Sequence, residues 1–298
     1  MSPTHPARPG CPVRTCALLA VLLASAAASA QTTWRLVPEG GVVSFEVLRS
    51  VPATDFQIVD RLGTERTFTA SPLQSVQILT ARVPLGGRWT GVGEIVTAYS
   101  SYDAPRGTDA ALLTPDQFAV GNPYIGIEAR AGGGLSLTAG GRLPVSSVSG
   151  ATNDGYTTSP ERGDAFALEA GTVALGGRYE RALGVGTRVR LSLAPQLLYS
   201  SRQLDDGSLD RIGLAVGYGL VVAGDLGPVE VGGGVVGREP VAVQVAQFGY
   251  SRATVFEVGA VVAAGPVHPG LTLRLPTRTG VFNAPDAVVG LSLDIPLR

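Results

Sequence analysis

The sequence predicts an all-β fold: a transmembrane antiparallel up-and-down β-barrel of twelve strands that follows a cleaved signal peptide. Three observations support this fold class. Apolar and polar residues alternate with a period of two along most of the chain, as in strands with one apolar and one polar face. The connections between these stretches alternate between short and long. The stretches are about ten residues long, which suits a tilted membrane-spanning strand better than the five or six residues usual in globular sheets.

The first 30 residues have the parts of a secretory signal peptide. Arg8 and Arg14 form a charged leader, Ala17 to Ala28 is an apolar run, and Ala28-Ser29-Ala30 is a small-x-small cleavage site. We therefore expect residues 1–30 to be removed on export and residues 31–298 to form the barrel. The apolar run is shorter than the ~20 residues of a spanning helix, and no second run of this kind occurs.

The clearest pair of strands lies in the stretch Tyr124 to Val145, YIGIEARAGGGLSLTAGGRLPV. Gly132 and Gly133 lie between its two halves and supply the positive φ angles of a tight hairpin turn. Pro144 and the polar run after it mark the end of the second strand. Apolar residues recur at every second position: Ile125, Ile127, Ala129 and Ala131 in the first half, and Leu135, Leu137, Ala139, Leu143 and Val145 in the second.

The same alternation predicts the remaining strands in order. The twelve are Val42–Arg49, Val76–Leu85, Trp89–Ser100, the two strands of this hairpin, Phe166–Arg181, Val189–Tyr199, Ile212–Val222, Val229–Gly237, Thr254–Ala263, His268–Pro276 and Ala287–Arg298. A charge on a lipid-facing position near the midplane costs roughly 2 to 4 kcal/mol, so Glu94 must face inward. Trp89, Ile95 and Tyr99 then face outward. In the sixth strand, Glu169 fits this orientation only if a bulge lies nearby.

The lengths of the connections indicate the topology. Short ones follow even-numbered strands: Gly86-Gly87, Gly132-Gly133, Ala182 to Gly186, Gly224 to Pro228 and Gly265-Pro266-Val267. Long polar ones follow odd-numbered strands: Ser50 to Ser75, Ser101 to Asn122, Ser146 to Ala165, Ser201 to Asp210, Arg238 to Ala253 and Thr277 to Asp286. Outer-membrane barrels have short periplasmic turns and long extracellular loops, and an even number of strands places both termini in the periplasm.

Composition and motifs exclude several classes of function. The chain is 45% apolar with a net charge of −1, so it is neither a disordered segment nor a basic nucleic-acid binder. Both cysteines, Cys11 and Cys16, lie in the leader, so the chain from Gln31 onward has no thiol. Nucleophile-elbow, zinc-protease, phosphate-loop and EF-hand motifs do not occur. We expect no cofactor, no metal and no catalytic residue. His268, at the edge of a turn, is interpreted as structural, with a base in a Ser-His pair as the alternative.

A resemblance can be stated from two segments, GNPYIGIEAR at residues 121–130 and GGRLP at residues 140–144. With the Gly-rich hairpins, they resemble outer-membrane barrel proteins of the transporter family named for the meta-pathway of phenol degradation. The resemblance implies a porin-like outer-membrane protein of a Gram-negative-type bacterium that transports small solutes. The chain departs from the usual barrel signature because it ends in Arg298 instead of an aromatic residue. Expected partners are outer-membrane lipid, the barrel-assembly machinery and an unidentified small solute.

Inward-facing charges are the candidate functional residues. The predicted strand directions place eight of them in the periplasmic third of the lumen as a constriction: Arg82, Arg130, Arg178, Glu180, Arg188, Arg190, Glu230 and Asp294. Five arginines against three acids favour anionic solutes, but a paired cluster can equally be a structural plug. A charge-x-Pro motif at four strand ends (residues 82–84, 142–144, 274–276 and 294–296) indicates strand termination or, alternatively, a constriction.

Three hypotheses stay open on the sequence alone. The first is a narrow channel or transporter for small solutes, anionic or hydrophobic. The second is a structural or surface-interaction barrel that acts through its extracellular loops. The third is a barrel hydrolase. Twelve strands lie between the eight whose side chains fill a barrel and the sixteen or more of an open porin, so the sequence predicts a narrow lumen.

Overall fold

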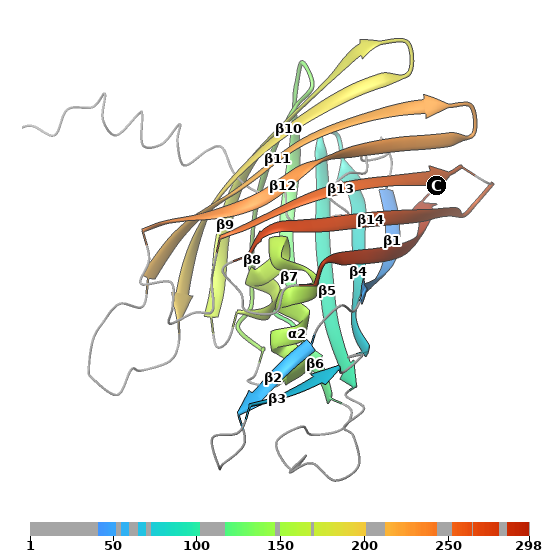
Figure 1. Cartoon of the computed structure of the whole chain (residues 1–298). Coiled ribbons are helices and arrows are strands. Elements are labelled where there is room, and N and C mark those ends of the chain that lie inside the picture. Colours follow the sequence, from blue (N-terminus) through green and yellow to red (C-terminus); the bar gives the residue numbers. More distant parts are fainter. Residues whose placement is uncertain are drawn as a thin grey trace, which may run out of the picture.

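The computed structural model describes residues 41–51, 55–59, 65–69, 73–101, 117–146, 150–167, 170–200, 212–242, 252–263, 265–279 and 285–297. Thirteen of its strands form one sheet in the order β4-β1-β15-β14-β13-β12-β11-β10-β9-β8-β7-β5-β6, and β4 also pairs with β5 (Figure 1). This second pairing closes the sheet into a ring of twelve antiparallel strands, with β6 as an extra strand. The predicted twelve-stranded barrel is therefore confirmed.

The elements agree closely with the alternation in the sequence. In chain order they are β1 (Gly41–Val51), β2 (Asp55–Val59), β3 (Glu65–Thr69), β4 (Leu73–Gly86), β5 (Trp89–Ser101), β6 (Gln117–Val120), β7 (Tyr124–Gly132), β8 (Leu135–Arg142), α2 (Gly150–Thr158), η2 (Pro160–Phe166), β9 (Ala170–Gly184), β10 (Thr187–Ser200), β11 (Ile212–Leu226), β12 (Val229–Ala242), β13 (Ala253–Val262), β14 (His268–Thr279) and β15 (Ala287–Leu297). Each predicted strand corresponds to one strand of the ring. The predicted start of the sixth strand at Phe166 is wrong, because Phe166 belongs to η2 and β9 begins at Ala170. Glu169 lies outside the described residues.

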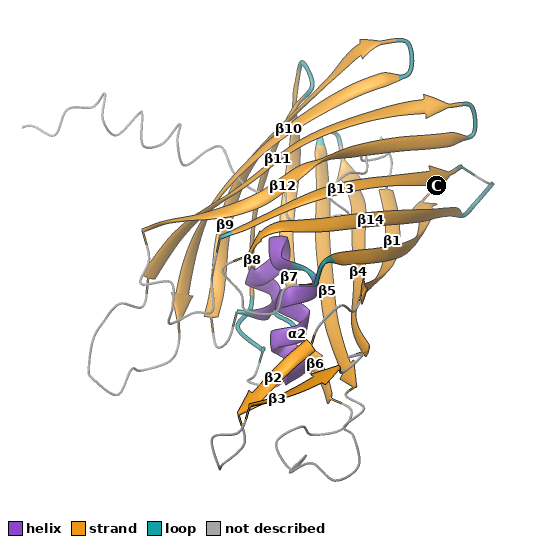
Figure 2. Cartoon of the chain, viewed as in Figure 1, coloured by secondary structure: helices purple, strands orange, loops and turns teal. Residues whose placement is uncertain are grey.

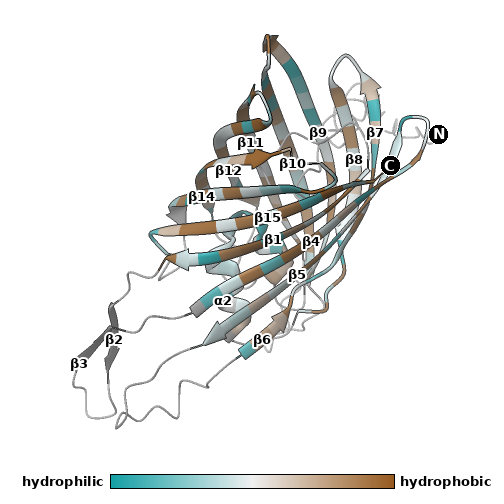
Figure 3. Cartoon of the chain, turned by 90° about the vertical axis from the view of Figure 1, so that its right-hand side faces the viewer, coloured by the Kyte–Doolittle hydropathy of each residue, from teal (hydrophilic) through white to brown (hydrophobic). Residues whose placement is uncertain are grey.

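The two faces of the wall have the predicted polarity. On β5, the side chain of Ile95 is 51% exposed on the outer face, whereas Glu94 on the inner face is 2% exposed. On β10, Leu191 and Leu193 are exposed, whereas Arg190 is buried. Figure 3 shows hydrophobic and hydrophilic positions alternating along the strands. The inward orientation of Glu94, inferred from the cost of a charge in lipid, is confirmed.

Short turns join the strands at one end of the ring. Gly86 and Gly87 have φ angles of 104° and 56°, and Gly132 and Gly133 have φ angles of 90° and 60°. Residues with a Cβ rarely adopt such angles, so glycine is required at these turns. The strands also run further into the turns than the sequence predicts, since β9 extends to Gly184 and β11 to Leu226.

Three of the long connections contain regular structure that the sequence analysis did not predict. The connection from Ser50 to Ser75 contains the hairpin of β2 and β3, which pair from Asp55↔Thr69 to Val59↔Glu65. The connection from Ser101 to Asn122 contains β6, which pairs with residues 97–100 near the C-terminal end of β5, while β7 pairs with residues 89–94 at its N-terminal end. Strands β6 and β7 thus share one position in the ring, separated only by residues 121–123.

The third such connection folds into the barrel. Its two short helices, α2 and η2, lie within the ring of strands (Figure 2). We call residues 150–166 the plug. Its apolar residues Ala151, Tyr156, Ala165 and Phe166 form the largest buried apolar cluster with wall residues. The expectation that this connection is an exposed polar loop is therefore wrong. No described helix is long and apolar enough to span a membrane.

Candidate functional site

The plug sits nearer the end of the barrel that carries the long connections. Its wall partners show this: Gln74 lies at the start of β4, Ala98 near the end of β5, and Arg142 is the last residue of β8. The amide of Gln74 donates to Asp154 Oδ1 over 2.9 Å. A Cβ added at Gly155 would lie 2.9 Å from the Cβ of Ala98, so glycine lets α2 approach β5 closely. The helix sequence GATNDGYTT contains two glycines and few strong helix formers, so contacts with the wall must stabilise it.

Asn122 anchors the C-terminal end of the plug. It lies in the short break between β6 and β7 and has no exposed surface. Its side-chain amide donates to the backbone carbonyls of Asp164, Ala167 and Ala170 over 3.2, 2.8 and 3.1 Å. Its side-chain oxygen accepts from the backbone N–H groups of residues 145 and 146 over 2.8 and 2.7 Å. One asparagine therefore joins both ends of the connection that contains the plug to the wall.

Arg142 joins the wall to the plug through charge. Its guanidinium donates to Glu94 Oε1 over 2.5 Å, to Asp164 Oδ2 over 2.8 Å and to the backbone oxygen of Asn122 over 2.9 Å. The guanidinium carbon also lies 5.6 Å from the centre of the Tyr124 ring. The side chains of Arg142 and Glu94 are both fully buried. Charge-assisted hydrogen bonds of this kind are about twice as strong as neutral ones.

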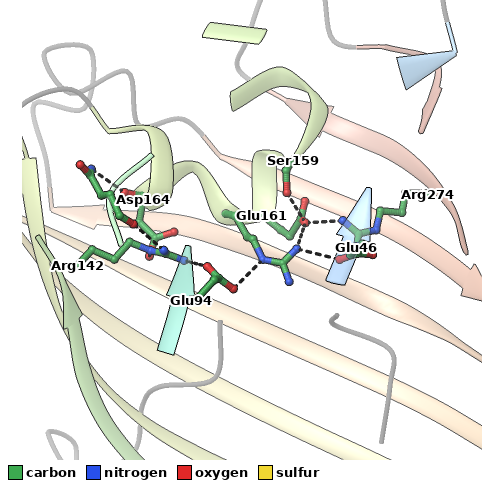
Figure 4. Close-up of polar contacts among 9 residues, drawn as sticks. Glu46, Glu94, Arg142, Ser159, Glu161, Asp164 and Arg274 are labelled. Carbon is green, nitrogen blue, oxygen red and sulfur yellow. Dashed lines mark hydrogen bonds and ion pairs between the residues drawn. The ribbon is translucent and has the colours of Figure 1, made fainter. Parts of the chain in front are cut away.

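Arg274 on β14 makes the equivalent contacts on the other side of the plug. It donates to Glu46 Oε1 over 3.0 Å and to Glu161 Oε1 over 2.9 Å, and its Nε lies 3.6 Å from Glu257 Oε2. The Ser159 hydroxyl donates to the same oxygen of Glu161 over 2.8 Å. Figure 4 shows Arg274 with Glu46 and Glu161, and Arg142 with Glu94 and Asp164, between the helices and the wall. The wall and the plug therefore share one buried ionic network.

Arg162 lies between the two wall arginines and comes from the plug itself. Its Nε is 3.4 Å from Glu94 Oε2, and its Nη1 is 3.7 Å from Glu46 Oε2 and 3.5 Å from Glu161 Oε1. The side chain is fully buried. Among the described residues none accepts a hydrogen bond from its three nitrogens. The contacts of Arg162 are therefore ion pairs at distances longer than good hydrogen bonds.

A cation–aromatic contact completes the attachment of the plug. Arg238 on β12 donates to the hydroxyl of Tyr156 over 3.0 Å, and its guanidinium carbon lies 5.6 Å from the centre of that ring. A Cβ at Gly163 would overlap both side chains, so glycine is required at this position of η2. Tyr156 and Arg238 are both buried.

The predicted constriction residues lie on the strands near the short turns, and we call them the lower layer because these turns are the expected periplasmic ones. The carboxylate of Glu128 forms ion pairs with Arg82 at 2.7 Å and with Arg178 at 2.8 Å. Arg188 forms ion pairs with Asp225 at 2.9 Å and with Glu230 at 3.1 Å. The other four differ in exposure: Arg190 and Asp294 are buried, Glu180 is half-buried and Arg130 is exposed.

The sequence analysis left Glu128 and Asp225 out of this layer. Counting both as members gives five acids against five arginines. The arginine surplus on which the expected anion preference depended is therefore removed. The arginines of the charge-x-Pro motif also divide between the two layers: Arg82 contacts the lower carboxylate Glu128, whereas Arg142 and Arg274 hold the plug.

The described residues contain no group of three or more His, Cys, Asp or Glu side chains that could hold a metal ion. His268 is the first residue of β14, directly after the turn at residues 265–266, and its register partner on β15 is Asp294. His268 therefore lies at the edge of a turn, as predicted from the sequence.

Solved structures with a similar fold are outer-membrane proteins. An outer membrane channel from Pseudomonas putida F1 has a TM-score of 0.57 and 17% identity, covering 90% of this chain and 99% of that chain. LpxR from Salmonella typhimurium has a TM-score of 0.49 and 13% identity, and the match covers 86% of this chain and 100% of LpxR. The P. putida toluene transporter TodX has a TM-score of 0.46 and 9% identity, and the match covers 88% of this chain and 91% of TodX. No protein-family model and no curated protein sequence matches the chain. The likeness to the first channel shows that this chain has the fold of an outer-membrane β-barrel.

Proposed function

We propose that the protein is a narrow channel or transporter for small solutes in the outer membrane. The observation that supports this most is the chemistry of the lumen. The inner face carries paired charges, small polar side chains and glycines, whereas a barrel that serves only as a scaffold can fill its interior with packed apolar side chains. The likeness to an outer membrane channel and the resemblance of residues 121–144 to a transporter family support the same proposal.

The location follows from the two surfaces of the wall. Large apolar side chains such as Leu193, Phe256 and Leu291 are exposed on the outer face of the ring. A contiguous apolar exterior of this kind is stable in lipid and is an aggregation liability in water. The expected signal peptide of residues 1–30 would export the chain to the outer membrane.

We expect the channel to discriminate only weakly between anions and cations. The lower layer holds as many acids as arginines, and most of its charges are within hydrogen-bond distance of an opposite charge. A paired layer narrows the passage without giving it a strong net potential. We therefore expect small conductance with little preference between anions and cations, and we make no assignment of a particular solute.

Planar-bilayer conductance of the purified protein tests the proposal. The wild type should give small, discrete conductance steps. Replacing Arg188 and Arg190 together by serine should enlarge the steps, because two long side chains leave the lower layer. Arg252→Ser is the control, because Arg252 pairs with Glu239 at an exposed site near the C-terminal end of β12, so its loss should leave conductance unchanged.

The main alternative is a structural barrel that acts through its extracellular connections. The plug favours it, because the plug fills part of the lumen with buried side chains. If neither the wild type nor the double variant conducts, this alternative is supported. A hydrolase would instead require activity that disappears with His268→Ala.

A further inference from the structure

We propose that the plug is a displaceable gate and that Arg162 is the residue that holds it closed. The proposal rests on the proposed channel function and extends it: the lumen has a closed state and an open state that differ in the position of residues 150–166. Three features of the structure lead to it: the independence of the sheet from the plug, the pairing of the wall charges with one another, and the contacts of Arg162.

The sheet does not need the plug. All twelve positions of the ring pair with neighbouring strands, and the plug adds no strand to the ladder. Among the described residues, the backbone of the plug is bonded to the backbone of the wall at one place, where Asn122 N donates to Ala165 O over 2.6 Å at the C-terminal end of η2. The remaining anchors are side chains, so the plug can move without breaking the barrel.

The wall charges keep partners when the plug leaves. Arg142 retains Glu94 at 2.5 Å, and Arg274 retains Glu46 at 3.0 Å and Glu257 at 3.6 Å. All five of these residues lie on strands of the ring. An unpaired buried charge is the main cost of separating an ionic network, and here most wall charges avoid it. An open state in which water enters the lumen is therefore accessible.

The closed state depends on Arg162. Three arginines serve the four carboxylates in the network of Figure 4, and Arg162 is the one supplied by the plug. Removing its charge would leave these four carboxylates with two arginines, Arg142 and Arg274, in a buried space. Since like charges repel strongly there, and since two of the carboxylates belong to the plug, the plug would be driven outward.

The same residue is also the easiest anchor to release. Its ion pairs with Glu46 and Glu94 are 3.7 and 3.4 Å long, and its nitrogens make no hydrogen bond to other described residues. Outside the lumen, water would satisfy all of its donors. Arg162 thus stabilises the closed position mainly through charge, which is what a reversible latch requires.

Cysteine accessibility tests the gate directly. The chain from residue 31 onward contains no cysteine, so Ser192→Cys on the inner face of β10 introduces a single thiol into the lumen. A charged methanethiosulfonate reagent is added to protein in vesicles. Adding Arg162→Met to this background should raise the rate of modification by about tenfold or more, because a buried ionic network loses a bridging charge. Arg162→Lys retains the charge and should behave as the parent.

The outcomes separate the gate from the channel. Heat-modifiable gel mobility first confirms that each variant is folded. Equal modification rates in the folded parent and the folded Arg162→Met variant would overturn the gate. If Arg162→Met raises the rate of cysteine modification but no variant conducts in bilayers, the result supports the gate and rejects the channel. Conductance that is the same in wild type and Arg162→Met, with unchanged modification, would support the channel and reject the gate.

A crosslink gives an independent check. In a chain without Ser192→Cys, Ala98→Cys and Gly155→Cys place two thiols where the Cβ positions are 2.9 Å apart, about 1 Å closer than in a disulfide, so α2 must shift outward slightly for the bond to form. Oxidation of this pair in the Arg162→Met background should return conductance to the wild-type level, and reduction should restore the increase. If the oxidised pair leaves the increase in place, the plug is not the moving element.

Discussion

Replacing Arg142 by methionine removes the side chain through which β8 holds both Glu94 and Asp164. Methionine is flexible and unbranched, so it can occupy much of the same volume without its charge. The substitution deletes three hydrogen bonds of 2.5, 2.8 and 2.9 Å. Glu94 keeps an ion pair of 3.4 Å with Arg162, whereas Arg142 supplies the only ion pair found for Asp164 among the described residues.

The expected cost is large because the site is fully buried. The side chains of Arg142 and Glu94 have no exposed surface. Removing one partner of a buried pair costs about 3 to 5 kcal/mol, because the remaining charge stays desolvated. The matched control is Arg188→Met, which breaks the pairs with Asp225 and Glu230 at a side chain that is 33% exposed. Ion pairs of this exposed kind contribute about 0 to 1 kcal/mol.

The free energy of unfolding from urea titrations in phosphocholine vesicles measures both variants. We expect Arg142→Met to lose at least about 2 kcal/mol more than Arg188→Met, from the difference between the two ranges above. Release of the plug would reduce the loss, and it would be visible as faster modification of a cysteine at position 192. A small loss with unchanged modification at that position would refute the reasoning.

The remaining predictions concern the wall, the anchor and the location. Leu193→Arg places a cation in lipid and should cost roughly 2 to 4 kcal/mol, whereas Ser192→Arg places it in the lumen and should cost little; equal losses on folding into vesicles would mean that the faces are misassigned. Asn122→Ala leaves buried carbonyls and N–H groups unpaired at about 1 to 3 kcal/mol each, so thermal unfolding should shift strongly downward, with Asn122→Asp intermediate because it keeps the acceptor. The processed protein should begin at Gln31 and fractionate with the outer membrane; recovery as a soluble periplasmic protein would contradict the location.

The sequence predicts the wall well because lipid imposes a simple rule on it. On β10, every second residue from Val189 to Tyr199 must be compatible with lipid, so the period of two is visible without any structure. Glu94 shows the strength of the rule: one charge was enough to orient β5 correctly.

The plug could not be predicted in the same way. Residues 146–165 are rich in Gly, Ser, Thr and Asp, which is equally typical of a solvated loop. The relevant signal lay elsewhere, in the inward carboxylates Glu46, Glu94 and Glu257, which together require cations that the neighbouring strands supply only in part. The sequence analysis also did not include Glu128 and Asp225, which pair with arginines of the lower layer.

The order in which the wall and the buried ionic network fold depends on which strands the network joins. Most neighbours in the ring are also neighbours along the chain, but β1 pairs with β15 only when the two ends of the sheet meet. The hydrogen bond from Arg274 to Glu46 spans 228 residues and crosses this seam. Contacts between residues so distant in sequence form late, since closing the intervening loop costs entropy first. We therefore expect the Arg274–Glu46 side of the network to form only when the ring closes, whereas the bond from Arg142 to Asp164 spans 22 residues and can attach the plug to β8 earlier.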